Sequence, residues 1–184
     1  MKSRYPELND LGLVFIARDA YTPAECTTIV ERIERERPRL TTDGTPRGTV
    51  RHNSRVVVFD KVLADDLYTR VAPVIPPSLI GMRSVGANEC IRFYRYGPGD
   101  FFKPHQDTHF MRSPLEKSLL SIVVYLNDNY DGGELTFPGR GDVIKPTPGL
   151  AVAFGHRMLH ESATIRAGTK YAFRSDVMYR GEEP

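Results

Sequence analysis

From about residue 85 onward, the chain consists of short alternating segments separated by turn residues. Residues 89–96, 118–126 and 170–179 each alternate between two kinds of side chain, and Gly97-Pro98-Gly99-Asp100 is a turn signal between two such segments. Short strands at this spacing are typical of an all-β sandwich or barrel. We therefore expect two helices early in the chain, followed by roughly eight strands.

The first half of the chain contains the two expected helices. Thr22, Pro23 and Glu25 form a helix start, with a capping residue, a proline at the first helical position and a capping box. Cysteine and isoleucine or valine side chains then recur at helical spacing, which predicts one apolar face, and Pro38 ends the helix. A second helix is predicted over residues 61–72, before a proline cluster.

The segments around these helices complete the expected architecture. Residues 11–17 and 51–60 are predicted to be strands, and residues 40–50, rich in glycine, proline and threonine, are predicted to be a flexible loop. Residues 150–154 alternate large with small side chains, so we expect one face there to leave room for a ligand. The prediction is one domain over residues 1–184, with helical support and first strands in 1–84 and a β core in 85–180.

Composition excludes several classes of function. The net charge of +2 is too small to indicate a nucleic-acid or membrane partner, and no apolar run approaches the length of a membrane span. Cys26 and Cys90 give no disulfide framework, and the first residues lack an apolar signal core. We therefore expect a cytoplasmic protein with a reduced, buried Cys26.

His105 and Asp107 are the most informative side chains of the β-rich half. In an extended chain, residues two apart project from the same side of the backbone, so an imidazole and a carboxylate would lie together. His160 can add a second imidazole to this pair. Two histidines and one carboxylate form a facial triad that leaves three positions open on a first-row metal ion.

The order of motifs resembles the iron(II)/2-oxoglutarate-dependent oxygenases of the prolyl 4-hydroxylase type. The similarity covers roughly residues 85–180, and the two leading helices also fit. The matching motifs are Tyr96-Gly97-Pro98-Gly99, His105-x-Asp107, Tyr125-Leu126-Asn127, Gly132-Gly133-Glu134, Leu159-His160-Glu161 and Gly168-Thr169-Lys170-Tyr171.

This resemblance implies a double-stranded β-helix (jelly roll, cupin-like), mainly β, with the N-terminal helices packed outside. It also implies that His105, Asp107 and His160 bind Fe(II), with 2-oxoglutarate and O2 as co-substrates and ascorbate as a candidate accessory reductant. Related halogenases have a small residue at the position of Asp107. The carboxylate therefore indicates hydroxylation, or another C–H oxidation, of a small-molecule or amino-acid-like substrate.

The resemblance also points to residues that would bind 2-oxoglutarate. Lys170, ten residues after His160, matches the basic residue of the family and is our first choice for its far carboxylate. Arg174 lies on the same strand face and is the rival. Tyr96, Tyr125 and Leu135 are expected beside the co-substrate, although either tyrosine could serve as wall packing instead.

Substrate contacts are expected from two polar strand faces. The first follows the predicted loop and the second precedes the turn at residue 97; their residues are Arg51, Asn53, Arg55, Arg92 and Tyr94. Several arginines converging on a pocket favour an anionic group on the substrate, such as an amino-acid carboxylate. A solvated basic face is the competing interpretation for Arg51, and residues 40–50 are a candidate lid.

Three alternatives stay open from the sequence. The first is a prolyl 4-hydroxylase acting on a protein or peptide. The second, from another class, is a non-enzymatic metal-binding or ligand-binding jelly roll. The third is a nucleic-acid demethylase, which would need a basic groove with stacking aromatic residues and finds little support in this composition. The oligomeric state is not predicted.

Overall fold

The structure is a computed structural model that describes residues 13–42 and 49–182. Its first described helix is α2 (Pro23–Glu36), where Thr22 and Glu25 form the expected capping box. The helix ends one residue before Arg37, which takes a left-handed conformation. Cys26 and Ile33 on its apolar face are buried, so the predicted helix and its buried thiol are confirmed.

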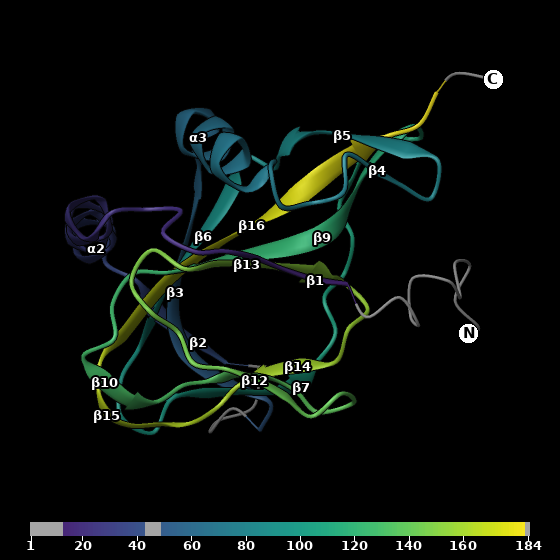
Figure 1. Cartoon of the computed structure of the whole chain (residues 1–184). Helices are drawn as coiled ribbons and strands as arrows, with labels where there is room; N and C mark the ends of the chain where they lie inside the picture. The colour runs from purple at the N-terminus through teal and green to yellow at the C-terminus, as the bar shows by residue number, and fades with distance from the viewer. Residues whose placement is uncertain (1–12, 43–48, 183–184) are drawn as a thin grey trace.

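Helix α3 (Lys61–Val71) follows a long strand and begins at Asp60, whose carboxylate accepts a hydrogen bond from the Leu63 backbone amide. Leu67 and Val71 are buried on one side of α3. Both helices lie on the outer face of the main sheet (Figure 1). Among the described residues, no helix has the length and apolar character needed to cross a bilayer.

Most of the remaining chain is strand. The strands are β1 (Val14–Ala17), β2 (Arg39–Thr42), β3 (Arg51–Phe59), β4 (Ser78–Leu79), β5 (Met82–Ala87), β6 (Cys90–Tyr96), β7 (Phe101–His105), β8 (Met111–Ser113), β9 (Glu116–Tyr125), β10 (Tyr130–Gly132), β11 (Leu135–Phe137), β12 (Asp142–Ile144), β13 (Ala151–Gly155), β14 (His160–Ser162), β15 (Ile165–Gly168) and β16 (Lys170–Arg180).

Fourteen of these strands form one curled antiparallel sheet, whose main path runs β1-β13-β9-β16-β6-β3-β7-β14-β11-β12, and β10 pairs with β15 in a separate two-stranded sheet. Strand β3 belongs to both halves of the curl. Its C-terminal part pairs with β6, whereas Arg51 and His52 pair with β7. The chain therefore forms two facing layers, with β13, β9, β16 and β6 in one and β7, β14 and β12 in the other (Figure 1).

The register of the main layer decides which side chains face the second layer. In β16, Lys170, Ala172 and Arg174 are directly opposite Tyr96, Tyr94 and Arg92 of β6. The opposite face of β16 contributes Phe173 to the apolar core, where Ile33 of α2 and Leu67 of α3 are also buried. Alternation along β16 thus separates an apolar layer beneath the helices from a polar layer inside the curl.

Three expectations about local structure are wrong. Residues 40–42 belong to β2, which pairs with β3; of the rest of the expected loop and lid, residues 49–50 lie outside any strand and residues 43–48 lie outside the described residues. The β-rich part begins at β4 rather than at residue 85. Thirteen strands follow α3 rather than roughly eight, because several are only two to four residues long and give no periodic signal.

The prediction that the small residues of β13 leave room for a ligand is also wrong. Ala151 and Ala153 pack into the apolar core beneath the helices. The large side chains Val152 and Phe154 face the other way, with Tyr125 and Leu135. Small residues on β13 therefore let the strand pack closely against its own core.

Candidate metal centre and co-substrate cavity

The structure brings together His105, Asp107 and His160, as predicted. His105 ends β7, Asp107 follows it, and His160 begins β14 directly opposite His105. One ligand atom from each of the three residues lies within 4.8 Å of the other two. Segments 55 positions apart in sequence thus meet because β7 and β14 are paired.

Each imidazole is oriented by its own strand. Nδ1 of His105 lies 2.8 Å from the carbonyl oxygen of Lys103, and Nδ1 of His160 lies 2.9 Å from that of Met158. A carbonyl only accepts hydrogen bonds, so both Nδ1 atoms carry the proton and both Nε2 atoms present a lone pair. This is the tautomer that binds a metal ion.

Burial keeps these imidazoles neutral. It lowers the pKa of His105 to about 4, with the nearby His160 acting in the same direction. Burial likewise lowers the pKa of His160. The ring of Phe102 is stacked on His105 with centroids 3.4 Å apart, and Phe154 lies 4.5 Å from the His160 ring. Both ligands are therefore deprotonated at Nε2 and held between aromatic walls.

Asp107 is fixed by Arg174 and Ser121. A terminal nitrogen of Arg174 lies 2.9 Å from one carboxylate oxygen, and the Ser121 hydroxyl donates to the other at 2.6 Å. The second terminal nitrogen of Arg174 donates to Asp176 at 2.9 Å. Burial acts to raise the pKa of Asp107, but Arg174 and His160 outweigh it and lower the pKa to about 2. Asp107 is thus an anion at neutral pH.

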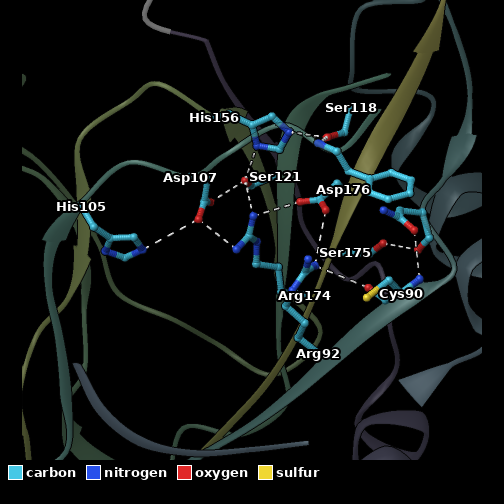
Figure 2. Close-up of polar contacts among 12 residues, drawn as sticks. Cys90, Arg92, His105, Asp107, Ser118, Ser121, His156, Arg174, Ser175 and Asp176 are labelled. Carbon is cyan, nitrogen blue, oxygen red and sulfur yellow. Dashed lines mark hydrogen bonds and ion pairs between the residues drawn. The ribbon is translucent and has the colours of Figure 1, made fainter. Parts of the chain in front are cut away.

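A directed chain of hydrogen bonds continues from Ser121 (Figure 2). Because Ser121 gives its hydrogen to Asp107, it accepts from Nδ1 of His156 at 2.8 Å. Nε2 of His156 must then accept from the Ser118 hydroxyl, also at 2.8 Å. His156 is buried, and burial lowers its pKa to about 4. This chain fixes the rotamer of Asp107 from behind.

The three ligand side chains suit a divalent first-row metal ion. Two neutral imidazole nitrogens and one carboxylate are the donors of the 2-His-1-carboxylate triad. The hydrogen bonds behind each ligand are of the kind that orients metal-binding side chains. The donor set, the tautomers and the charges therefore all fit Fe(II).

Residues 91–175 match the family model described as the 2OG-Fe(II) oxygenase superfamily. This segment contains all three predicted ligands. The chain is therefore similar to this superfamily over just under half of its length.

Prolyl hydroxylases are among its similar proteins. Prolyl 4-hydroxylase 1 of Arabidopsis thaliana is 29% identical over 109 residues, a match that covers 46% of this chain and 38% of the relative. The chain thus matches well under half of that curated relative. The sequence similarity thus extends to a prolyl 4-hydroxylase.

Two solved structures share the fold. One is the viral collagen prolyl hydroxylase of Paramecium bursaria Chlorella virus-1 in a 2OG complex, with a TM-score of 0.66, 16% identity and coverage of 96% of this chain and 99% of that one. The other is a Trichoplax adhaerens prolyl hydroxylase with a hypoxia-inducible-factor peptide fragment, with a TM-score of 0.67, 16% identity and coverage of 94% and 86%. The double-stranded β-helix expected from the sequence is confirmed.

An open cavity adjoins the metal ligands. His105 and His160 line it at one side, and the predicted co-substrate residues also line it: Tyr96, Tyr125, Leu135, Lys170 and Arg174. The sequence prediction that these side chains face one space is therefore consistent with the structure.

Lys170 is the buried cation of this cavity. Its ammonium group donates to the carbonyl oxygen of Gly133 at 2.6 Å and to the Ser162 hydroxyl at 2.8 Å. The rings of Tyr96 and Tyr125 lie 5.3 and 5.1 Å away. All four groups are neutral, and burial lowers the pKa of Lys170 to about 7.

The predicted substrate residues lie along the β3–β6 side of the same polar layer. Arg55 is directly opposite Tyr94, which lines the cavity. The Arg51 guanidinium lies over the rings of Tyr94 and Phe102, at 5.6 and 4.6 Å. Arg51 is therefore packed against the site wall, which argues against the solvated basic face.

Sequence reasoning missed four supporting residues: Phe102, Ser121, His156 and Asp176. A signal existed for two of them, because Ser121 and Asp176 are polar residues next to apolar runs of long strands. Buried polar side chains need partners, so such positions point to a polar site. Phe102 and His156 have no distinguishing sequence context.

Proposed function

We propose that the protein is an Fe(II)- and 2-oxoglutarate-dependent oxygenase that hydroxylates an unactivated C–H bond of an amino-acid-like small molecule. The observation that supports this best is the position of Lys170. A buried lysine with no direct ion pair among the described residues, influenced only by the more distant Glu134, lines the same cavity as two histidines of a complete facial triad. A structural metal site would need no such cation.

His105, Asp107 and His160 would hold Fe(II). Bound there with 2-oxoglutarate and O2, the metal supplies the oxidising chemistry, in which 2-oxoglutarate is converted to succinate and CO2. Asp107 would contribute one negative charge while Arg174 and Ser121 keep its rotamer fixed. The neutral imidazoles would bind without releasing protons at neutral pH.

Lys170 would bind the far carboxylate of 2-oxoglutarate. A buried ammonium group without a counter-ion is costly, and a carboxylate placed against it removes that cost. Arg174 lacks this need, because Asp107 and Asp176 already contact its guanidinium. Tyr96, Tyr125 and Leu135 would enclose the rest of the co-substrate, with Leu135 packing against its aliphatic chain.

An oxidation inside this cavity requires that water be kept out. The walls supply apolar contacts from Leu135, Val123 and Phe102. The role of the protein is then to orient the substrate C–H bond and shield it. Ascorbate, if needed, would act only as an accessory reductant.

The competing substrate class is a protein or peptide proline. Its support is the similarity to a plant prolyl 4-hydroxylase and to a prolyl hydroxylase solved with a peptide. The arginines beside Tyr94 favour the small anionic substrate instead, because a proline within a peptide offers them no carboxylate. A non-enzymatic jelly roll would leave the buried Lys170 without a role.

Anaerobic titration of the Fe(II) protein with 2-oxoglutarate tests the proposal. We expect a visible charge-transfer band, and on admission of O2 we expect succinate to form. H105A and H160A should lose both signals. H109Q is the matched control, since His109 lies two residues beyond Asp107 on an exposed loop and outside the ligand cluster. Wild-type protein that behaves like H105A would refute the function.

Mass spectrometry would then identify the substrate class. Free amino acids and proline-containing peptides are incubated in parallel with the loaded enzyme. Gain of one oxygen atom by a free acid supports the proposal, and gain by peptides alone supports the prolyl 4-hydroxylase alternative.

A further inference from the structure

Three arginines surround Tyr94 on the β3–β6 side of the cavity. Arg55 of β3 is directly opposite Tyr94 in the register, and Arg92 precedes Tyr94 by two residues on the same face of β6. The Arg51 guanidinium lies 5.6 Å from the centre of the Tyr94 ring. One arginine therefore contacts this tyrosine of the cavity wall, and two more lie on the same strand faces beside it.

These arginines lack sufficient counter-charge. Asp176 lies 3.4 Å from Arg92, but it also takes a closer contact from Arg174. Arg51 donates from Nε to the Asn53 side chain, a neutral partner. Within residues 13–42 and 49–182, Arg55 has neither an ion pair nor a hydrogen bond from its side chain. Positive charge thus remains in excess on this wall.

Two buried donors nearby also lack acceptors. Nη2 of Arg51 is shielded from solvent and has no hydrogen-bond partner among the described atoms. Nδ2 of Asn53 has none within ordinary hydrogen-bond distance, although the Asn53 side chain lies close enough to the Tyr96 hydroxyl to offset part of the rise that burial causes in its pKa. Asn53 as a whole is buried, with 0% exposure. Leaving such donors unpaired costs roughly 1–3 kcal/mol each, so a site that retains them is suited to a ligand that accepts hydrogen bonds.

Their position relates them to the metal centre. The Phe102 ring lies between Arg51 and His105, 4.6 Å from the guanidinium and stacked at 3.4 Å on the imidazole. Tyr94 and His105 line the same cavity. A ligand group bound at Tyr94 would therefore lie one aromatic ring away from a metal ligand, at a distance suited to a short substrate.

We propose that Arg51, Arg55 and Arg92, together with Tyr94 and Asn53, form the subsite for a carboxylate of the substrate. This proposal rests on the proposed function and names its substrate class: a small molecule with a free carboxylate. Guanidinium groups bind a planar carboxylate through two parallel hydrogen bonds. The subsite thus selects free acids over their amides, and it is separate from Lys170.

Calorimetric binding to the Co(II)-loaded protein, saturated with 2-oxoglutarate, tests this without any turnover. The probes are the free L-amino acids, their C-terminal amides, and an end-blocked proline peptide. We expect at least one free acid to bind more than tenfold more tightly than its amide. R55Q and R92Q should each weaken binding of that acid about tenfold or more. Binding of the amide should barely change.

R83Q is the matched control, because Arg83 is an exposed arginine of β5 in another part of the sheet. Arg55 is the most informative substitution, since in the described part of the chain its side chain has no ion-pair or hydrogen-bond partner whose loss could disturb folding. Denaturant unfolding of each variant confirms that stability is retained.

The subsite is wrong if acids and amides bind equally, if R55Q binds every acid like wild type, or if the blocked peptide binds most tightly. It is also wrong if R55Q or R92Q loses affinity for 2-oxoglutarate itself, because the arginines would then serve the co-substrate. Failure of the proposed function would give a different result, because wild-type protein would then bind no 2-oxoglutarate. In that case, binding of the same acids, amides and peptide to the metal-free protein would show whether the arginines bind a carboxylate.

Discussion

A terminal nitrogen of Arg174 lies 2.9 Å from a carboxylate oxygen of Asp107. This ion pair is buried, and Asp176 holds the other terminal nitrogen of the same guanidinium. Burial acts to lower the pKa of Arg174, but the two carboxylates outweigh it and raise the pKa. Arg174 is thus a positioning residue for a metal ligand.

Replacement of Arg174 should weaken metal binding. In R174Q, Asp107 keeps the Ser121 hydrogen bond but loses its cation, so we expect Co(II) affinity to fall about 10–100-fold. Calorimetric titration with Co(II) measures this effect. R174K, which keeps the charge but loses the planar fork, should recover part of it. Unchanged affinity in R174Q would show that Asp107 needs no support from Arg174.

The stability of the metal-free protein should fall in mild acid because of His156. Its folded pKa of about 4 lies below the ordinary value of 6.5, so the unfolded chain binds the proton first as the pH falls. The free energy of unfolding should therefore decrease between pH 6.5 and about 4, by roughly 1.4 kcal/mol per pH unit from this residue.

Denaturant unfolding at several pH values measures that slope. H156Q keeps an amide near Ser121 and Ser118 but cannot take up the proton, so its slope should be shallower. H109Q is the matched histidine replacement on an exposed loop. Equal slopes in H156Q and wild type would contradict the assignment.

Affinity for 2-oxoglutarate should depend on pH through Lys170. Burial lowers its pKa to about 7 in the free protein, and only the charged form attracts a carboxylate. Binding should therefore weaken roughly 25-fold between about pH 6.5 and 8.5, with proton uptake on binding above pH 7. The charge-transfer titration at each pH gives the dissociation constants. The K170R variant stays charged over this pH range, so its affinity for 2-oxoglutarate should not depend on pH. If its affinity still depends on pH, a group other than Lys170 is responsible.

Gly149 is a position where any side chain should destabilise the fold. Its φ is +79°, and a Cβ placed there would lie 1.9 Å from the carbonyl oxygen of Tyr21. For G149A we expect a loss of about 1–3 kcal/mol from backbone strain alone, with the clash adding to it. Gly141 has a φ of +73° in open space, so G141A isolates the strain. Denaturant unfolding that gives equal losses would rule out the clash with Tyr21.

Local sequence signals predicted much of this fold. The capping box at Thr22 and the cap at Asp60 set both helix starts, because the donors they satisfy lie within three residues. Most of the longer strands, β3, β6, β9, β13 and β16, were predicted through their alternation, whereas β5 and β7 were not. The shortest strands, such as β8 and β12, were missed because their pairing partners, not their own residues, determine them.

The site residues were likewise predicted where the signal was local and missed where it depended on strand pairing. Spacing alone placed His105 and Asp107 together, and resemblance added His160 and Lys170. The partner of Arg174 could not be read from sequence, because it depends on how β16 faces the end of β7 across the curl. A buried arginine and a buried aspartate on different strands have no signature until the register is known.

The orientation of each imidazole by a carbonyl two residues earlier in its own strand has a consequence for handling the protein. The coordination geometry is built into two short stretches of main chain, so it exists before any ion arrives. Chelators should then empty the centre reversibly while circular dichroism stays native. Surrogate ions can be exchanged in the folded state, which makes spectroscopic substitution practical without a refolding step.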